Sequence, residues 1–541
     1  MPEHVIHLQG YESRMTYDAI VVGAGPNGLM SANLLADKGW SVLLLEAQEE
    51  VGGAVRSAED VHPGFVHDTF SAFYPFVAAS HAMQSLSLDE HGVRWRHAPA
   101  VLGHPFPDGE WALLVRDREV TAALMDRQHP GDGQAWLDLC AQWDRIGEHV
   151  LGALISPFPP VRHGLSALLR LPGAGGLDLV KQLLSPVIRF GDLRFGGRAP
   201  KILLAGNAGH SDIPPNAPGS GMFGLLMTML AQTVGYPVPE GGASALSEAM
   251  ARRLESRGGV VRCSSPVVRI DVERGRATGV RTASGERFRA RRAVVADVVA
   301  PNLFEKLLEP RAVPPRKLRA LQQFQLDPST VKVDWALDGE IPWASAPEHQ
   351  PGTFHVADSL EQMAVAQAQI TAHAIPAHPF MLAGQMATCD PTRAPEGKQS
   401  VWAYTHVPQS TTHDAGDSGI RGVWDRDDCE RFADRMQERI ERIAPGFGSR
   451  ILARRVLGPR QFEERDANLI GGAINGGTSQ LQQEAVLRPV PGLGRPETGI
   501  SGLYLGSASA HPGGGVHGGP GYNAARAALA HHRVRSVLGR G

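Results

Sequence analysis

The sequence predicts a mixed α/β fold, in which a domain with a parallel sheet is interrupted by a domain built on an antiparallel sheet plus helices. Two observations carry this prediction. A strand, a glycine turn, a helix and a second strand open the chain, and a strand, a glycine-rich turn and a helix close it. The 541 residues exceed one ordinary domain, so we expect two domains that share an interface.

The opening unit covers residues 17–46. A buried strand is expected at residues 19–22 and a helix at residues 29–38, before a second strand that ends on Glu46. The turn between them has the spacing of a Rossmann-like dinucleotide site, with a helix N-terminus that faces a pyrophosphate and an acid that reaches a ribose hydroxyl. The turn residues predicted to bind the cofactor are Gly23, Gly25, Pro26, Asn27 and Gly28.

Composition excludes several other kinds of protein. The 53 basic and 56 acidic residues nearly balance and no basic run stands out, so we expect no nucleic-acid partner. The four cysteines are far apart, which argues against a redox dithiol and a zinc site and fits a reducing cytoplasm. We therefore predict no metal and a cytoplasmic location. Residues 1–14 lack a signal-peptide core and are expected to be an extension outside the fold.

The residues after Glu46 distinguish FAD from NAD. A glycine pair, Gly52–Gly53, follows the acid closely, which resembles the flavoprotein superfamily of amine oxidases, phytoene desaturases and Rab GDP-dissociation inhibitors. The resemblance implies that this backbone lies along FAD. The usual arginine after the pair is absent, because Ala54 stands there and Arg56 comes two residues later. The cofactor contacts implied in this segment are Glu46, Ala47, Gly53, Ala54 and Arg56.

A second segment of the same domain is expected further along the chain. A helix at residues 243–257 precedes strands at residues 260–263 and 266–270, a hairpin, and a buried strand at residues 293–297. This order resembles the superfamily's second FAD segment, in which the backbone at the position of Val267 or Val268 meets the adenine. The predicted FAD domain is therefore discontinuous, with residues 15–79, 236–312 and 457–541, and residues 80–235 and 313–456 form the substrate domain.

Several features of the intervening segments leave alternatives open. The aromatic residues between positions 70 and 76 suit either a core or one wall of an apolar pocket, and the buried pair His67–Asp68 suits a structural hydrogen bond or acid–base work. Residues 222–230 suit a buried helix lining a cavity or a lipid-facing surface, and are too short to span a membrane.

Two further elements are expected in the second half of the substrate domain. Residues 329–337 alternate as in an antiparallel strand with one polar face, and residues 427–443 suit an exposed amphipathic helix. Amine oxidases carry a flavin-linked lysine near the end of the corresponding strand. A loose alignment puts Asp338 there, with Lys332 nearby, which argues against amine oxidation.

The closing segment carries the second strong motif. Seven of the sixteen residues from 506 to 521 are glycine, a composition that favours close approach of the backbone to a flat ligand at a helix N-terminus. His511-Pro512-Gly513-x-Gly515 resembles the phytoene desaturase ending, and the full stretch is more similar still to pyridine nucleotide-disulfide oxidoreductase domain 2 proteins. The residues expected at the flavin are Gly506, Ser507, Gly515 and Val516, with His511 and His517 as candidate catalytic residues or structural donors.

The resemblance implies an FAD-dependent oxidoreductase, a dehydrogenase or desaturase that takes hydride from a largely apolar substrate to flavin N5. FAD is expected to be non-covalent, and oxygen, a quinone or transiently bound NAD(P) to accept the electrons. Peripheral contact with a membrane and the oligomeric state stay open. Two alternatives remain: a flavin amine or amino-acid oxidase, and a non-catalytic carrier or regulator with a fold like that of GDP-dissociation inhibitors.

Overall fold

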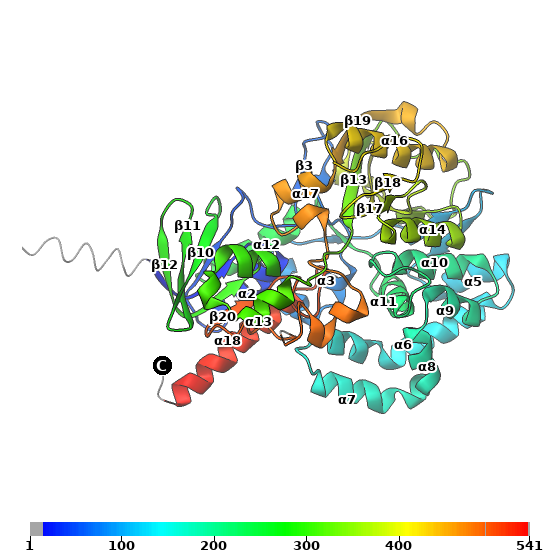
Figure 1. Ribbon diagram of the computed structural model, residues 1–541. Coiled ribbons are helices and arrows are strands. Elements are labelled where there is room, and N and C mark those ends of the chain that lie inside the picture. Colours follow the sequence, from blue (N-terminus) through cyan, green and yellow to red (C-terminus); the bar gives the residue numbers. More distant parts are fainter. Residues whose placement is uncertain (1–14, 493, 539–541) are drawn as a thin grey trace, which may run out of the picture.

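The computed structural model describes residues 15–492 and 494–538, so the expected extension at residues 1–14 lies outside the described residues. Within the described ranges the strands form two large sheets, and Figure 1 shows them at opposite ends of the molecule, with helices around each. This arrangement confirms the predicted mixed α/β fold.

The first sheet combines strands from the start, middle and end of the chain, in the order β10-β11-β12-β1-β2-β9, with β20 paired to β12. Its parallel part joins β1 to β2 and β12, β2 to β9, and β12 to β20. The predicted hairpin is the antiparallel pair β10–β11, which continues into β12. The bounds are β1 (Thr16–Val22), β2 (Val42–Leu45), β9 (Val260–Arg262), β10 (Val267–Glu273), β11 (Arg276–Thr282), β12 (Arg287–Ala296) and β20 (Leu503–Leu505).

Three helices cover one face of this sheet: α2 (Pro26–Ala36), α12 (Ser244–Ser256) and α18 (Gly519–Val537). Leu29, Leu246 and Ala525, one from each helix, are buried in a single apolar core with alternate residues of β1 and β2. Helix α2 starts three residues earlier than expected because Pro26 suits the first helical position, where no backbone donor is needed. The three helices thus hold the start and the end of the chain together.

The second sheet has the order β19-β13-β17-β16-β14-β6-β7. Strands β6 and β7 come from residues 80–235 and pair with each other, and β6 also pairs with β14 from residues 313–456, so the two expected substrate segments share one sheet. The bounds are β6 (Ala100–Pro105), β7 (Trp111–Leu114), β13 (Ser329–Leu337), β14 (Pro351–Val356), β16 (Met381–Gln385), β17 (Gln399–Val407) and β19 (Ile451–Leu457).

Strand β13 has the expected polar face, but that face does not meet solvent. All nine residues of this strand are buried, because β17 and β19 pair with its two edges and other elements cover both its faces. Its polar residues Lys332 and Asp334 form an ion pair within the protein. The alternation therefore marks two buried faces, one apolar and one charged.

Helices of the substrate segments pack on the second sheet and beside it (Figure 1). Helix α16 (Arg426–Ile443) buries Phe432, Met436 and Ile440, as its amphipathic pattern predicts. Its charges are not all solvated, because Arg435 and Arg439 are buried against Asp414 and Asp358. The other helices include α5 (Arg118–Gln128), α6 (Asp132–Ile155), α7 (Val161–Arg170), α8 (Gly176–Leu184), α9 (Val187–Arg194), α10 (Arg198–Ala208), α11 (Ser220–Thr233) and α14 (Leu360–Thr371).

Helix α11 contains the apolar stretch at residues 222–230 and is largely buried, in agreement with the interpretation of that stretch as an internal helix. None of the helices among the described residues has both the length and the apolar character needed to cross a bilayer. Short elements used below are β3 (Ser57–Ala58), β4 (His67–Asp68), α3 (Pro75–Ala79), the 3₁₀ turn η5 (Pro391–Arg393) and α17 (Pro459–Arg465).

Candidate cofactor and substrate site

The two glycine-rich turns lie against each other, although more than 450 residues separate them in the sequence. A Cβ on Gly521 would stand 1.9 Å from the carbonyl oxygen of Asn27, and a Cβ on Gly28 would stand 2.0 Å from that of Gly23. Both distances are too short for any side chain. The N-termini of α2 and α18 therefore converge only because glycine occupies these positions.

The glycine pair after Glu46 packs onto the first turn. A Cβ on Gly53 would lie 3.1 Å from the Cα of Gly25, and the Gly52 amide donates to the carbonyl of Ala24 at 2.8 Å. Arg56 is buried and donates through Nε to the carbonyl of Gly53 at 2.9 Å. Arg56 thus supports the backbone of the pair, while Ala47 has an exposed side chain beside it.

Three carboxyl groups surround the first turn. Glu46 accepts hydrogen bonds from the amides of Ala24 at 2.7 Å and Gln48 at 2.9 Å, and Asp297 accepts one from the amide of Gly28 at 2.8 Å. Asp466 is the third. Burial, aided by the other two carboxylates, raises the pKa of Asp297 to about 8, and burial also raises the pKa values of Glu46 and Asp466. Burial therefore makes these carboxyl groups harder to ionise than they are in water.

Sequence reasoning placed Glu46 but missed Asp297 and Asp466 as site residues. Asp297 follows a buried parallel strand, β12, just as Glu46 follows β2, and β1 lies between these two strands. Acids at the carboxyl ends of neighbouring parallel strands meet at one edge of the sheet, so this signal was present in the sequence. Asp466 follows the short helix α17 and carries no comparable signal.

The residues present fit FAD. At the N-termini of α2 and α18 the amides of Gly28 and Gly519 are bonded to Asp297 and His517. Those of Asn27 and Gly521 make no hydrogen bond to another described residue and stay available for an anionic or electron-rich ligand. Two buried polar atoms at the turns, Oδ1 of Asn27 and Nδ2 of Asn475, have no hydrogen-bond partner among the described residues. At the expected adenine position, β10 shifts register between Val267 and Arg269, and Val268 is 50% exposed.

Two other predicted contact residues lie at the carboxyl end of β20. The amide of Gly506 donates to the carbonyl of Ala296 at 2.8 Å, and Ser507 is buried, with its Oγ accepting from the amide of Ser509 at 3.3 Å. Gly506 and Ser507 thus lie at the same sheet edge as Asp297. The end of β20 and the C-terminal turn that follows it are thereby connected to the first glycine turn.

A cavity of about 280 Å³ lies where the C-terminal turn meets the second sheet. Gly514, Gly515, Val516 and Ala54 form part of its wall. Most of the remainder is apolar, and Phe223 and Met227 come from the buried helix α11. The aromatic residues between positions 70 and 76 thus line a pocket. The aromatic lining residues are Phe70, Phe73, Tyr74, Phe76, Phe223, Tyr236, Trp402, Tyr404 and Phe462.

Neither candidate catalytic histidine is among the described residues that line this cavity. His517 uses both ring nitrogens, Nε2 at 3.1 Å from the carbonyl of Gly514 and Nδ1 accepting from the amide of Gly519 at 3.0 Å. Burial lowers the pKa of His517 to about 4. His511 places Nε2 3.0 Å from the carbonyl of Ser156, outside the turn. Both contacts match the structural role that was left open for these residues.

Lys332 brings a charge into the cavity wall. Its side chain is 2% exposed, and Nζ donates to the carbonyl of Asp68 at 2.8 Å and pairs with Asp334. Arg455 forms the second ion pair of Asp334, at 2.8 Å. Burial lowers the pKa of Lys332. The alignment that put Asp338 in this role is wrong, because Asp338 lies beyond β13 with its side chain 62% exposed and paired with Lys398.

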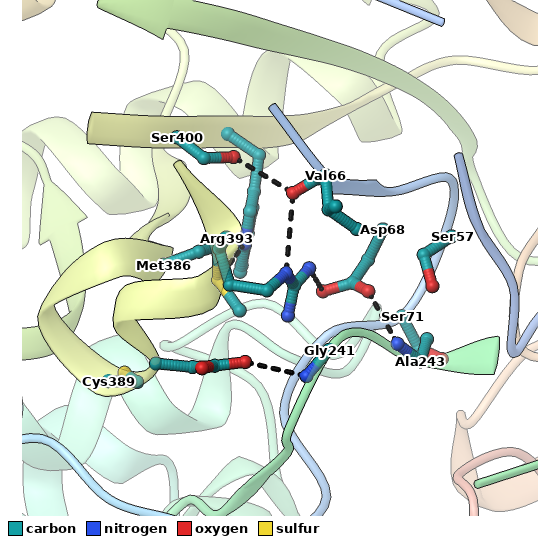
Figure 2. Close-up of polar contacts among 12 residues, drawn as sticks. Ser57, Val66, Asp68, Ser71, Gly241, Ala243, Met386, Cys389, Arg393 and Ser400 are labelled. Atoms are coloured by element: carbon teal, nitrogen blue, oxygen red, sulfur yellow. Dashed lines mark hydrogen bonds and ion pairs between the residues drawn. The ribbon is translucent and has the colours of Figure 1, made fainter. Parts of the chain in front are cut away.

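The pair His67–Asp68 has a structural role. Nε2 of His67 lies 3.1 Å from the carbonyl of Trp335, and the Asp68 carboxylate accepts from the amide of Ala243 at 2.8 Å. Figure 2 shows the guanidinium of Arg393 between the carboxylate of Asp68 and the carbonyl of Val66, and the ion pair measures 2.6 Å. Both side chains of that pair are 0% exposed. The Arg393–Asp68 ion pair thus connects η5, beside the second sheet, to the start of α12.

Known proteins match most of the chain. A family model described as flavin containing amine oxidoreductase matches residues 219–529, and one described as NAD(P)-binding Rossmann-like domain matches residues 21–86. The mouse protein named pyridine nucleotide-disulfide oxidoreductase domain-containing protein 2 is 29% identical, over 94% of this chain and 92% of its own length. The neurosporene-forming phytoene desaturase of Rhodobacter capsulatus is 24% identical, over 92% and 91%.

Solved structures share the fold. An oxidoreductase from Methanosarcina mazei has a TM-score of 0.61 at 15% identity, and the match covers 95% of this chain and 100% of that one. Cyclohexylamine oxidase from Brevibacterium oxydans has a TM-score of 0.57 at 15% identity, with coverage of 96% and 99%. The resemblance drawn from the two glycine motifs is thereby confirmed.

Proposed function

The chain belongs to the flavin-containing amine oxidoreductase family, and from this premise we propose that it is a dehydrogenase or desaturase acting on a largely apolar substrate. It is an FAD-dependent oxidoreductase. The observation that carries the proposal is the aromatic cavity whose wall includes the C-terminal turn at Gly514–Val516. Such a cavity binds an apolar molecule by excluding water, and orients it against the turn.

We propose that the cofactor is held along the line of the two turns. Residues Gly23–Gly28 and the N-terminus of α2 would face the pyrophosphate, Glu46 the ribose, and the backbone at Val267 or Val268 the adenine. Gly53, Ala54, Gly506, Ser507, Gly515 and Val516 would lie along the flavin half. When bound, FAD supplies a hydride acceptor at N5. Of the four described cysteines none lines the cavity, which supports a non-covalent cofactor.

The protein itself would orient the substrate, keep water away from it and supply one titratable cation. Lys332 is the only Lys, Arg, Asp or Glu among the described residues of the cavity wall, and its lowered pKa makes it easier to deprotonate. His511 and His517 stay as weaker candidates, since their ring nitrogens are directed to backbone groups around the turn. We propose that Lys332 holds or moves the proton that accompanies hydride loss.

The cavity favours an apolar substrate over an amine. A protonated amine loses its hydration in an apolar cavity, and aromatic rings offset only part of that cost unless a carboxylate is also present. The described cavity wall has aromatic rings but no carboxylate, and Lys332 would repel a cationic substrate when it is protonated. An amine oxidase therefore stays a second candidate, supported by the family's name. A non-catalytic carrier is disfavoured because both glycine turns are intact and in contact.

We further propose that oxygen, a quinone or a transiently bound NAD(P) accepts the electrons, and that the protein contacts a membrane peripherally, because an apolar substrate partitions into lipid. The experiment that tests the function is anaerobic bleaching of the flavin absorbance near 450 nm with a substrate panel of polyenes, acyl chains and amines. Bleaching by an apolar compound and not by amines is the expected result. Bleaching by amines alone, with peroxide release in air, would establish the second candidate instead.

A further inference from the structure

The surface formed by α7 and α8 is apolar and faces solvent. Helix α7 places Val161, Leu165, Leu168 and Leu169 at spacings of four, seven and eight residues, which is one face of a helix. These side chains are 71%, 56%, 63% and 72% exposed. All ten residues of α7 are described, and none of them is buried. The amphipathic face is therefore turned outward, unlike that of α16.

The apolar surface continues onto the next helix. Leu177 and Leu184 of α8 are 82% and 55% exposed, and Leu193 of α9 is 49% exposed. In Figure 1, α7 forms the outer edge of the molecule beneath α6 and α8. So many exposed leucines on consecutive helices are uncommon on a soluble monomer and mark a contact with a partner or a membrane.

The charges carried by α7, α8 and the start of α9 are predominantly positive. Residues 161–189 contain four basic residues and one acidic residue, and all five are exposed. None of the four cations, Arg162, Arg170, Lys181 and Arg189, forms an ion pair with another described residue. By contrast, Arg431 on the exposed side of α16 pairs with Asp427. Free cations beside an apolar helix face complement the headgroups of anionic lipids.

The same segment lies against the C-terminal turn. The carbonyl of Ser156, at the end of α6, lies 3.0 Å from Nε2 of His511, and Nδ2 of Asn523 donates to the carbonyl of Ile155 at 3.0 Å. The ring of Phe158 packs edge-on against His511. A surface that inserts at α7 would therefore hold the turn at Gly514–Val516, and with it the cavity wall, close to the bilayer.

We propose that the face formed by α7 and α8 is a docking surface for an anionic phospholipid bilayer. Leu165, Leu168 and Leu169 insert among the acyl chains, while Arg162 and Arg170 contact the lipid phosphates. The proposal assigns the peripheral membrane contact proposed above to named helices and to anionic lipid. It rests on the proposed function in one respect, the assumption that the substrate is apolar and lies near the membrane.

Vesicle flotation of the full-length, FAD-loaded protein tests this surface. We expect at least tenfold stronger binding to vesicles of phosphatidylcholine with 30% phosphatidylglycerol than to phosphatidylcholine alone, and weaker binding in 0.5 M salt. The double variant L168D/L169D should lose at least tenfold in binding. The variant R162E/R170E should lose the preference for anionic vesicles.

Matched controls are V365D, whose parent residue on α14 is 56% exposed, and R533E on α18. Both should bind like the parent protein. Unchanged FAD content and melting temperature show that each variant is folded. Equal binding of L168D/L169D and the parent, or no binding of the parent to anionic vesicles, would overturn the proposal.

A dimer that becomes a monomer in L168D/L169D, with no vesicle binding, would assign the face to a second copy of this chain. Vesicle binding needs no turnover, so it is separable from the proposed function. A protein that floats with vesicles but is bleached by no apolar compound would retain this surface and refute the proposed reaction.

Discussion

Gly521 of α18 stands so close to Asn27 of α2 that a Cβ would lie 1.9 Å from the Asn27 carbonyl oxygen. The variant Gly521→Ala must therefore move one helix N-terminus away from the other. We expect it to retain little FAD, measured as the ratio of absorbance at 450 nm to that at 280 nm, and to melt at a lower temperature. The loss follows from displacement of backbone amides, because alanine otherwise favours a helix.

Gly173→Ala is the matched control for this prediction, because a Cβ on Gly173 meets no atom within 4 Å. It should retain FAD and its melting temperature. Full FAD retention by Gly521→Ala would show that the two turns tolerate separation, and would remove the main support for a cofactor held between them.

Asp297→Asn tests the raised pKa at the first turn. The folded pKa of about 8 lies far above the unfolded value near 3.8, so the folded state binds an extra proton between these pH values. Stability of the FAD-free parent protein therefore falls as pH rises from 4 through 8, by about 1.4 kcal/mol for each pKa unit. Asparagine keeps an oxygen for the Gly28 amide and removes the titration.

We expect urea denaturation of FAD-free Asp297→Asn to show a weaker decline in unfolding free energy between pH 5 and pH 8 than the parent protein shows. FAD affinity should also fall more steeply with pH in the parent protein than in the variant, because a carboxylate at Asp297 would repel the phosphates and only Glu46 and Asp466 remain to titrate in the variant. Parallel pH profiles for the two proteins would mean that Asp297 is already ionised at pH 5.

His517→Gln tests a buried group whose pKa is shifted in the opposite direction from that of Asp297, so that acid rather than base destabilises the fold. Burial lowers the folded pKa of His517 to about 4, below the unfolded value of 6.5, so the unfolded state binds more protons between these pH values. Stability is then lost as pH falls from 6.5 to 4, by about 3 kcal/mol at most for this residue. Glutamine supplies a donor for Gly514 and an acceptor for Gly519 without titrating, so the variant should lose less stability on acidification.

The comparison for His517→Gln is the exposed histidine His81, whose glutamine variant should follow the parent protein from pH 7.5 to pH 4.5 in thermal melts. Buried His104 and His210, with pKa values near 4, retain part of the acid sensitivity in both variants. If His517→Gln abolishes substrate-driven bleaching while FAD content is unchanged, His517 contacts the reacting atoms and its structural role is secondary.

The sequence predicted the cofactor half of this site more fully than the substrate half. Gly23, Gly28 and Glu46 follow a local pattern of strand, turn and helix, which is set by backbone conformation and needs no long-range information. Gly521 belongs to a second local pattern of the same kind. Their contact across more than 450 residues was expected only from the family resemblance, since no spacing rule joins two distant turns.

The substrate half depends on long-range packing. Lys332 was named only as a neighbour of Asp338, which a loose alignment put at the position of the flavin-linked lysine. The pairing of β13 with β17 and β19, which helps to bury Lys332, leaves no trace in residues 329–337. Asp466 lies beside Gly53 because the loop after α17 leads back to the glycine pair. Such residues are placed by tertiary contacts that single-sequence periodicity does not encode.

Lys332→Met tests the cation in the cavity. Asp334 keeps its ion pair with Arg455 in this variant, so we expect FAD content to be unchanged and stability to fall only moderately. If Lys332 moves the proton, anaerobic bleaching by an apolar substrate should slow at least tenfold. Lys398→Met, which removes an exposed lysine paired with Asp338, should bleach at the parent rate. Equal rates for the two variants would leave Lys332 a structural role only.

Arg393 and Asp68 are both fully buried, so their ion pair offers a double-mutant cycle. Arg393→Met leaves the Asp68 carboxylate without its cation and should lower the unfolding free energy by about 3–5 kcal/mol. Asp68→Asn keeps an acceptor for the Ala243 amide, and in combination with Arg393→Met it removes both charges. The double variant should therefore be more stable than Arg393→Met alone in urea denaturation. If it is less stable by the full sum of the single effects, the two charges are not coupled. The link between η5 and α12 then depends instead on the neighbouring hydrogen bond that the Gly241 amide donates to Asp390.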